Sequence, residues 1–148
     1  MKTIWFDMDG TIANFYGVEN WLDYLKAENT HPYEVCKPMF TKRTMSGVVN
    51  GLREKGYSIG IISYVSHNAT ADYASRIAIV KNNWLKENFP AVDIIHICTK
   101  DTPKSAFYNN GDYLVDDEDK NLEDWKNVGG HTVKASGRKM LKALRNIV

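Results

Sequence analysis

Cysteine and long apolar runs are both scarce in this chain of 148 residues. Only Cys36 and Cys98 occur, far apart and without a CxxC spacing, which argues against a disulfide scaffold and against a zinc cage. No apolar run approaches the length of a membrane span, and no basic segment followed by an apolar one opens the sequence. We therefore expect a cytoplasmic protein with reduced thiols and no membrane partner.

The chain also has no large excess of charge of one sign, because 19 Lys and Arg are balanced by 18 Asp and Glu, which gives a net charge of +1. Such a balance creates no strong field toward duplex nucleic acid or a membrane, while a nucleotide-sized ligand stays compatible with it. Hydrophobic residues make up 43% of the chain and charged residues 25%, as in ordinary globular domains. We expect one domain over residues 1–148 and no particular oligomeric state.

Strand signals alternate with helical patterns along most of the chain. The expected strands are Lys2–Phe6, Tyr57–Ser63, Asp93–Cys98, Tyr113–Val115 and His131–Lys134. The expected helices are Thr44–Lys55, Ala69–Asn88, Leu122–Val128 and Gly137–Ile147. This alternation predicts an α/β fold, a three-layer sandwich around a central parallel sheet.

One segment, at about residues 14–43, interrupts the alternation and is rich in aromatic residues. Within it, Trp21–Ala27 has the pattern of a short amphipathic helix, and Thr30–Pro38 holds two prolines and is expected to be irregular. An insert between the first strand and its return crossover lies at the carboxyl edge of the sheet. We expect it to form a small helical cap over a site.

The stretch Ile4–Thr11 (I-W-F-D-M-D-G-T) ends a buried strand in two aspartates. Asp7 and Asp9 are two residues apart, so both side chains can face one site, while Met8 points the other way. Carboxylates there are costly unless a cation, hydrogen bonds or solvent offset them. Because ligands bind at the carboxyl ends of strands in open α/β sheets, this stretch predicts a site.

Other polar side chains stand at the ends of the expected strands. They are Ser63 after the second strand, Lys100 and Lys104 after the third, and Asp116 and Asp117 after the fourth. Several acids meeting at one edge favour a hard divalent cation, and magnesium typically binds one or two carboxylates together with a substrate phosphate. A lysine, a hydroxyl and the N–H groups of the Gly10 turn would hold the phosphate oxygens.

These residue types suit phosphomonoester hydrolysis. One aspartate can attack phosphorus to form an aspartyl-phosphate, and the other can protonate the leaving alkoxide and then activate water. A calcium loop fits less well, because an EF-hand needs glycine in sixth place, whereas Gly10 is fourth and Thr11 stands where the third acid should be. Taken alone, the D-M-D-G-T motif is also compatible with an alternative: the end of a strand and a turn, with exposed acids that have no catalytic function.

The motif D-M-D-G-T resembles the first motif, D-x-D-G-T/V, of the haloacid dehalogenase (HAD)-like phosphatases. Later pieces follow in that family's order: Ser63 closing an apolar strand, a lysine after the third strand, and the acidic Y-L-V-D-D. The resemblance spans the chain and is greater to the 5′(3′)-deoxyribonucleotidases, whose D-M-D-G-V-L-A-D-F is similar to D-M-D-G-T-I-A-N-F here. It implies a sheet order of 5-4-1-2-3 and a magnesium cofactor.

The resemblance also implies roles for individual residues. Asp7 would be the nucleophile and Asp9 the general acid and base. Magnesium would be held by Asp7, the Asp9 backbone carbonyl and Asp117, with Asp116 assisting or acting as the direct ligand instead. The remaining roles are phosphate binding by the Gly10–Thr11 turn, Ser63, Tyr64 and Lys104 (Lys100 being the alternative lysine), and contact of Phe15 with the base or sugar.

Three features depart from the deoxyribonucleotidase pattern and bear on substrate choice. Asn14 replaces an aspartate, Tyr64 stands where a smaller residue is common, and the cap is short. The expected substrate is a nucleoside 5′- or 3′-monophosphate. The alternatives are a phosphatase for another small metabolite or for a polynucleotide 3′-end, and a catalytically silent binding or regulatory module of the same fold.

Overall fold

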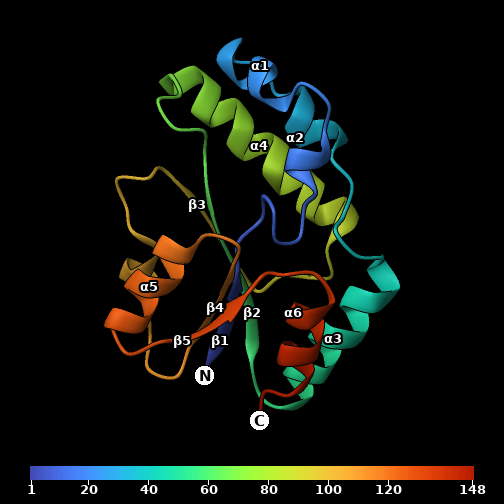
Figure 1. The fold of residues 1–148 in the computed structure, drawn as a ribbon, viewed down its shortest axis with the longest axis vertical. Coiled ribbons are helices and arrows are strands. Elements are labelled where there is room, and N and C mark those ends of the chain that lie inside the picture. Colours follow the sequence, from blue (N-terminus) through green and yellow to red (C-terminus); the bar gives the residue numbers. More distant parts are fainter.

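A five-stranded, all-parallel sheet forms the centre of the computed structural model, which describes residues 1–148 (Figure 1). Its strands are β1 (Thr3–Phe6), β2 (Ser58–Tyr64), β3 (Ile94–Cys98), β4 (Tyr113–Asp116) and β5 (His131–Lys134). They lie in the order β3-β2-β1-β4-β5. The α/β class is therefore confirmed, and the sheet order agrees with the expected one.

Helices cover both faces of the sheet and make three layers (Figure 1). One face packs against α3 (Lys42–Glu54), α6 (Arg138–Arg145) and the C-terminal half of α4 (Ala71–Asn88). The other face packs against α5 (Asp119–Asn127) and the 3-10 helix η2 (Lys104–Phe107). The apolar side of α3 is buried as its period predicts, with Thr41 as N-cap accepting the Thr44 N–H.

The direction of winding reverses between β1 and β4. From β1 the chain adds β2 and then β3 on one side. It then returns to the other side of β1, where it adds β4 and then β5. Phe6 pairs in register with Val115, and the Asp7 N–H donates to the Val115 carbonyl at 2.9 Å. The ends of β1 and β4 are therefore level at the switch point where such sheets bind ligands.

The long helix α4 belongs to two hydrophobic clusters. Trp84 and Leu85, in its C-terminal half, pack into the main core on the sheet, whereas Tyr73 and Ile77 pack into a second cluster with Phe15. The N-terminal half of α4 therefore extends past the sheet, where it supports the segment that follows β1 (Figure 1).

The cap formed by that segment contains the 3-10 helix η1 (Phe15–Gly17), α1 (Trp21–Lys26) and α2 (His31–Val35). The expectation of an irregular Thr30–Pro38 was wrong where α2 lies. Pro32 stands at the start of α2, where a helix needs no N–H donor, so this proline is compatible with helix formation rather than a break. The short helix expected at Trp21–Ala27 is present as α1.

The remaining differences concern element boundaries and two smaller expectations. Helix α3 begins at Lys42 and therefore takes the last residues of the expected insert, and α5 begins at Asp119 instead of Leu122. Cys36 and Cys98 are both free thiols. None of the helices combines the length and the apolar character needed to cross a membrane.

Candidate active site

A tight turn follows β1 and brings its two aspartates to one cavity. The Met8 carbonyl accepts the N–H groups of Thr11, Ile12 and Ala13 at 2.9–3.0 Å, and the Met8 side chain is buried in the core. Gly10 has φ +83°, and a Cβ there would lie 2.3 Å from Asp117 Oδ2. Glycine is therefore required both by the backbone and by the close approach of Asp117.

The turn differs in one respect from the anion cradle expected of it. The N–H groups of Gly10 and Thr11 donate to the carbonyls of Ala13 and Met8 inside the turn, and neither residue lines the cavity. Thr11 instead uses its side chain, because its Oγ1 donates to Asp7 Oδ2 at 3.1 Å and lies 3.5 Å from Asp117 Oδ1. The turn thus positions carboxylates.

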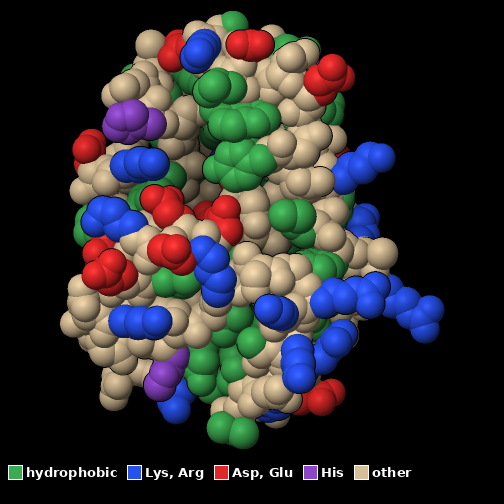
Figure 2. Space-filling view, viewed as in Figure 1, with side chains coloured by type: hydrophobic (Ala, Val, Ile, Leu, Met, Phe, Trp, Pro, Cys, Tyr) green, Lys and Arg blue, Asp and Glu red, His purple; other side chains and the backbone are tan.

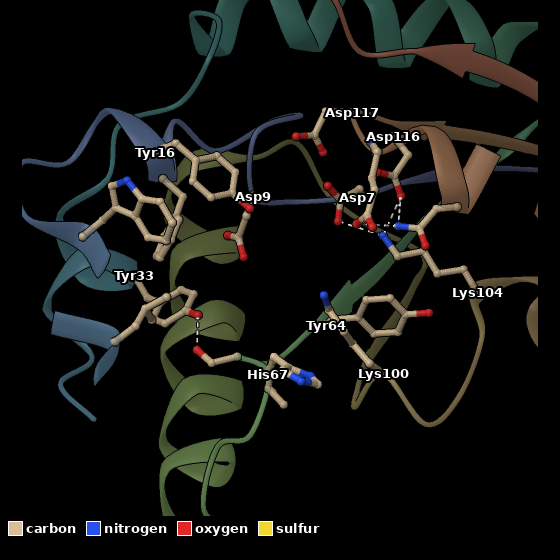
Figure 3. A pocket seen from close by; sticks show the side chains of 17 residues that line it. Asp7, Asp9, Tyr16, Tyr33, Tyr64, His67, Lys100, Lys104, Asp116 and Asp117 are labelled. Atoms are coloured by element: carbon tan, nitrogen blue, oxygen red, sulfur yellow. Dashed lines mark hydrogen bonds and ion pairs between the residues drawn. The ribbon is translucent and has the colours of Figure 1, made fainter. Parts of the chain in front are cut away.

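Lys104, at the start of η2, forms the central ion pairs of the site (Figure 3). Its Nζ lies 2.8 Å from Asp7 Oδ1 and 2.8 Å from Asp116 Oδ2, and the residue is 3% exposed. Burial by itself lowers the pKa of Lys104, but Asp7 and Asp116 outweigh it, so the pKa is raised and the ammonium stays charged. Lys100 lines the cavity without forming an ion pair.

Three carboxylates form a cluster that suits a metal ion. Asp7, Asp116 and Asp117 each offer one oxygen, and these oxygens lie within 4.8 Å of one another. Burial, and after it the nearby charges of Asp7 and Asp116, raise the pKa of Asp117 to about 8, so this acid favours its uncharged form as long as no cation neutralises the cluster. Oxygen-only ligands in this arrangement fit a hard divalent cation such as magnesium.

The charge balance of the site supports the same fit. Only two ammonium groups, those of Lys81 and Lys104, lie among the four acids Asp7, Asp9, Asp116 and Asp117, so full ionisation of the four acids would leave two negative charges. One divalent cation would neutralise them.

The two neighbouring acids at the end of β4 differ in how many hydrogen bonds they already accept. Asp116 is 1% exposed, and it accepts from the Glu118 N–H at 2.9 Å, from Asn121 Nδ2 at 3.1 Å and from Lys104. Asp117 is partly exposed, and the hydroxyl nearest its side chain, Thr11 Oγ1 at 3.5 Å, already donates its one hydrogen to Asp7. Asp117 therefore has more free coordination capacity than Asp116.

Asp9 pairs with a lysine that sequence reasoning missed. Lys81 of α4 places its Nζ 2.9 Å from Asp9 Oδ2, 2.7 Å from Ser63 Oγ and 2.7 Å from the Tyr64 carbonyl. Burial raises the pKa of Asp9, and the Lys81 charge opposes that rise without cancelling it. A sequence signal existed, because Lys81 falls on the apolar side of α4, four residues after Ile77.

Two predicted phosphate-binding residues lie at the end of β2. Ser63 is 1% exposed and bonded to Lys81, and it does not line the cavity. Tyr64 does line it, and Lys104 Nζ lies 5.2 Å from the centroid of the Tyr64 ring.

The cavity has a volume of about 400 Å³ and two unlike ends. The acids occupy one end, and aromatic rings of the cap occupy the other; Figure 2 shows acidic side chains beside a strip of hydrophobic ones around a hollow. Phe15 lines the cavity as predicted but is only 2% exposed, wedged against Tyr16 and Tyr33 at centroid distances of 5.3 and 4.6 Å. Tyr16, 52% exposed, presents more surface than Phe15 and was not singled out from the sequence.

No protein-family model matches this chain, and a search of curated proteins found no match either. Function is therefore inferred from the residues themselves and from their geometry.

Proposed function

We propose that this protein is a magnesium-dependent phosphomonoesterase that acts through an aspartyl-phosphate, with nucleoside monophosphates as its substrates. One observation carries the proposal: Lys104 Nζ bridges Asp7 and Asp116 at 2.8 Å each, beside Asp117, at the switch point of the sheet. The resemblance of D-M-D-G-T to the motif of HAD-like phosphatases supports the same reaction.

Asp7 is the nucleophile in this proposal. One of its oxygens forms a bond to phosphorus while the bond from phosphorus to the leaving alkoxide breaks. A carboxylate and a phosphate dianion repel each other, and the buried ammonium of Lys104 offsets that repulsion at 2.8 Å from Asp7. Thr11 Oγ1, which donates to Asp7 Oδ2, limits rotation of the carboxylate.

Asp9 moves the proton. It lines the same cavity as Asp7, and burial raises its pKa, so a protonated form is accessible. It donates that proton to the leaving oxygen and then takes one from the water that attacks phosphorus. This second step releases phosphate and regenerates the Asp7 carboxylate and the protonated Asp9.

The residues that would hold magnesium are Asp7 and Asp117, assisted by Asp116 and, as the family resemblance implies, by the Asp9 carbonyl. When bound, the ion supplies the positive charge that neutralises the carboxylates and the incoming phosphate. Gly10 makes room for this arrangement, because any larger residue would meet the Asp117 carboxylate.

The aromatic end of the cavity supports a nucleotide as substrate. Tyr16, Trp21 and Tyr33 line the cavity beside the carboxylates, and stacking a base on an aromatic ring contributes about 1–3 kcal/mol. The cap is held over the site, since Tyr33 Oη bonds to Ser66 Oγ at 2.7 Å and Glu28 accepts from Thr70 at 2.8 and 2.9 Å. A cap held in this way favours a small substrate over a polynucleotide end.

A substrate panel tests the proposal. Phosphate release would be measured with magnesium or EDTA from p-nitrophenyl phosphate, 5′- and 3′-nucleoside monophosphates of both sugars, sugar phosphates and a 3′-phosphorylated oligonucleotide. We expect magnesium-dependent release, fastest from a nucleoside monophosphate. A preference for sugar phosphates or the oligonucleotide would refute the nucleotidase part, and inactivity on every substrate would favour a silent binding module.

The intermediate can be sought directly. In Asp9→Asn, proton transfer is lost, so we expect a covalent phosphoryl adduct to accumulate when p-nitrophenyl phosphate is the donor. Intact-protein and peptide mass spectrometry would place the added phosphoryl group on Asp7. An adduct on any other residue would contradict the assignment of the nucleophile.

A further inference from the structure

Lys81 is a buried lysine to which the proposed reaction assigns no role. It is 1% exposed and lies on α4 between Ile77, which faces the cap cluster, and Leu85, which faces the sheet core. A lysine is almost never this buried unless its charge is paired, because desolvating an ammonium costs several kcal/mol. Its partners therefore indicate its role.

All three donors of Lys81 are used within the protein. They go to Asp9 Oδ2, to Ser63 Oγ and to the Tyr64 carbonyl, at 2.7–2.9 Å. Lys81 does not line the cavity, whereas Lys104 does. Lys81 can therefore reach a substrate only by giving up one of these bonds, and its effect on a reaction passes through Asp9.

The two oxygens of Asp9 have different surroundings. Oδ2 is held by Lys81, while Oδ1 accepts no hydrogen bond from the protein. Every fully buried side-chain oxygen or nitrogen in this protein has a hydrogen-bond partner, so Oδ1 is not fully buried. Because Asp9 lines the cavity, Oδ1 is the oxygen left for a substrate.

We propose that Lys81 is a positioning residue that holds Asp9 by Oδ2 and so directs Oδ1 to the leaving oxygen. This inference rests on the proposed phosphatase function. The anchor is rigid, since Ser63 and the Tyr64 carbonyl of β2 fix the ammonium from the other side. Lys81 would thus do for the proton-transferring carboxylate what Lys104 does for the nucleophile.

The dependence on leaving group separates positioning from a merely structural role. A nucleoside alkoxide must be protonated as it leaves, whereas p-nitrophenolate is a stable anion that leaves without a proton. Loss of a positioned general acid typically costs 10²–10⁴-fold. A displaced Asp9 should therefore slow phosphoryl transfer from a nucleotide to Asp7, the step that kcat/KM reports, and hardly affect the same transfer from p-nitrophenyl phosphate, while general misfolding would slow both.

The test measures kcat and KM for a nucleoside monophosphate and for p-nitrophenyl phosphate in Lys81→Met, Asp9→Asn and the double variant. Lys81→Met should lower kcat/KM for the nucleotide by about 10–100-fold, with kcat/KM for p-nitrophenyl phosphate changing far less. In the Asp9→Asn background, Lys81→Met should leave the ratio of the two rates unchanged. Lys86→Met is the matched control, since Lys86 is an exposed lysine of the same helix.

Equal losses of kcat/KM on both substrates in a folded Lys81→Met protein would overturn the inference. If that variant does not fold, Lys81→Arg is the deciding variant. Because its planar guanidinium cannot reproduce the three bonds, the ratio of the nucleotide rate to the p-nitrophenyl phosphate rate should fall. A ratio like that of the wild type would overturn the inference. An inactive wild-type protein would instead refute the proposed function, and the two failures are thereby distinguished.

Discussion

The two ends of the cavity are held in place by different forces. At the sheet edge, Asp7 and Asp9 are each fixed by a buried lysine at 2.8 and 2.9 Å. At the cap, the rings of Phe15, Tyr16 and Trp21 are held by packing at centroid distances of 4.9–5.6 Å, and Tyr16 is half exposed. Directional bonds suit groups that react, and ring packing suits a surface that selects by shape.

This difference follows from where each end comes from in the fold. The carboxylates follow strands whose register is set by the ladder of the parallel sheet, so the backbone that carries them is fixed by hydrogen bonds. The cap touches the rest of the molecule chiefly through α4 and the loop before it, where Tyr73 Oη bonds to the Asn29 carbonyl at 2.9 Å. Changes at the sheet edge should therefore abolish turnover, and changes in the cap should alter selectivity.

The largest expected effect comes from removing the nucleophile. Asp7→Asn should lower kcat by at least about 10⁴-fold on every phosphomonoester, because no covalent intermediate can form. Phosphate release is the measurement, with folding checked by circular dichroism. Asp119→Asn, at an exposed acid outside the cavity, is the control and should retain full activity.

The next effect should come from the lysine that bridges two acids. Lys104→Met should lower kcat by roughly 10²–10³-fold, because the charge beside the attacking carboxylate is lost. It should also lower the free energy of unfolding by about 3–5 kcal/mol, since Asp7 and Asp116 would stay buried without their cation. Urea denaturation measures the second quantity.

Lys100→Met is the matched control for that variant, because Lys100 lines the same cavity but makes no ion pair. We expect little change in stability and less than about a tenfold change in rate. Equal losses of kcat and of unfolding free energy in the two lysine variants would contradict the assignment of Lys104 as the central cation.

A smaller and more selective effect is expected from the cap. Tyr16→Ala should raise KM for nucleoside monophosphates by roughly 5–150-fold, which corresponds to 1–3 kcal/mol of stacking, and should leave kcat near its original value. Leu22→Ala is the control, at a cap residue of similar exposure (46%) that does not line this cavity. A fall in kcat without a change in KM would contradict a recognition role for this wall.

The smallest effect concerns stability without divalent cations. The folded-state pKa of Asp117 is about 8, above its ordinary value, so at intermediate pH the folded protein binds more protons than the unfolded one. Stability should therefore fall as pH rises from about 4 to 8. In Asp117→Asn, the fall in Tm between pH 4 and 8 should be smaller than in the wild type by a few degrees. Adding magnesium should raise the Tm of the wild type. A wild-type Tm that rises over this pH range in EDTA would contradict the excess of negative charge.

Much of this architecture was predictable because the relevant signals are local. Strand His131–Lys134 was placed correctly after the glycine pair that precedes it, and the apolar side of α3 followed from a 3.6-residue period. Helix α2 was missed because its proline suggested a break, although a proline at a helix start is favourable. The assignment of Phe15 as a substrate contact stays a prediction, since its ring is mostly covered by neighbouring rings.

The D-x-D spacing in the sequence was enough to place Asp7 and Asp9 at one cavity, because alternation along an extended chain is a property of the backbone itself. The ion-pair partners of these acids, in contrast, depend on the tertiary structure. Lys104 and Lys81 lie 97 and 72 residues away from Asp7 and Asp9, and each reaches its partner only because the crossovers bring η2 and α4 to the ends of β1 and β2. Local periodicity says which side of α4 is buried, but only packing against the sheet decides that the lysine on that side meets a carboxylate.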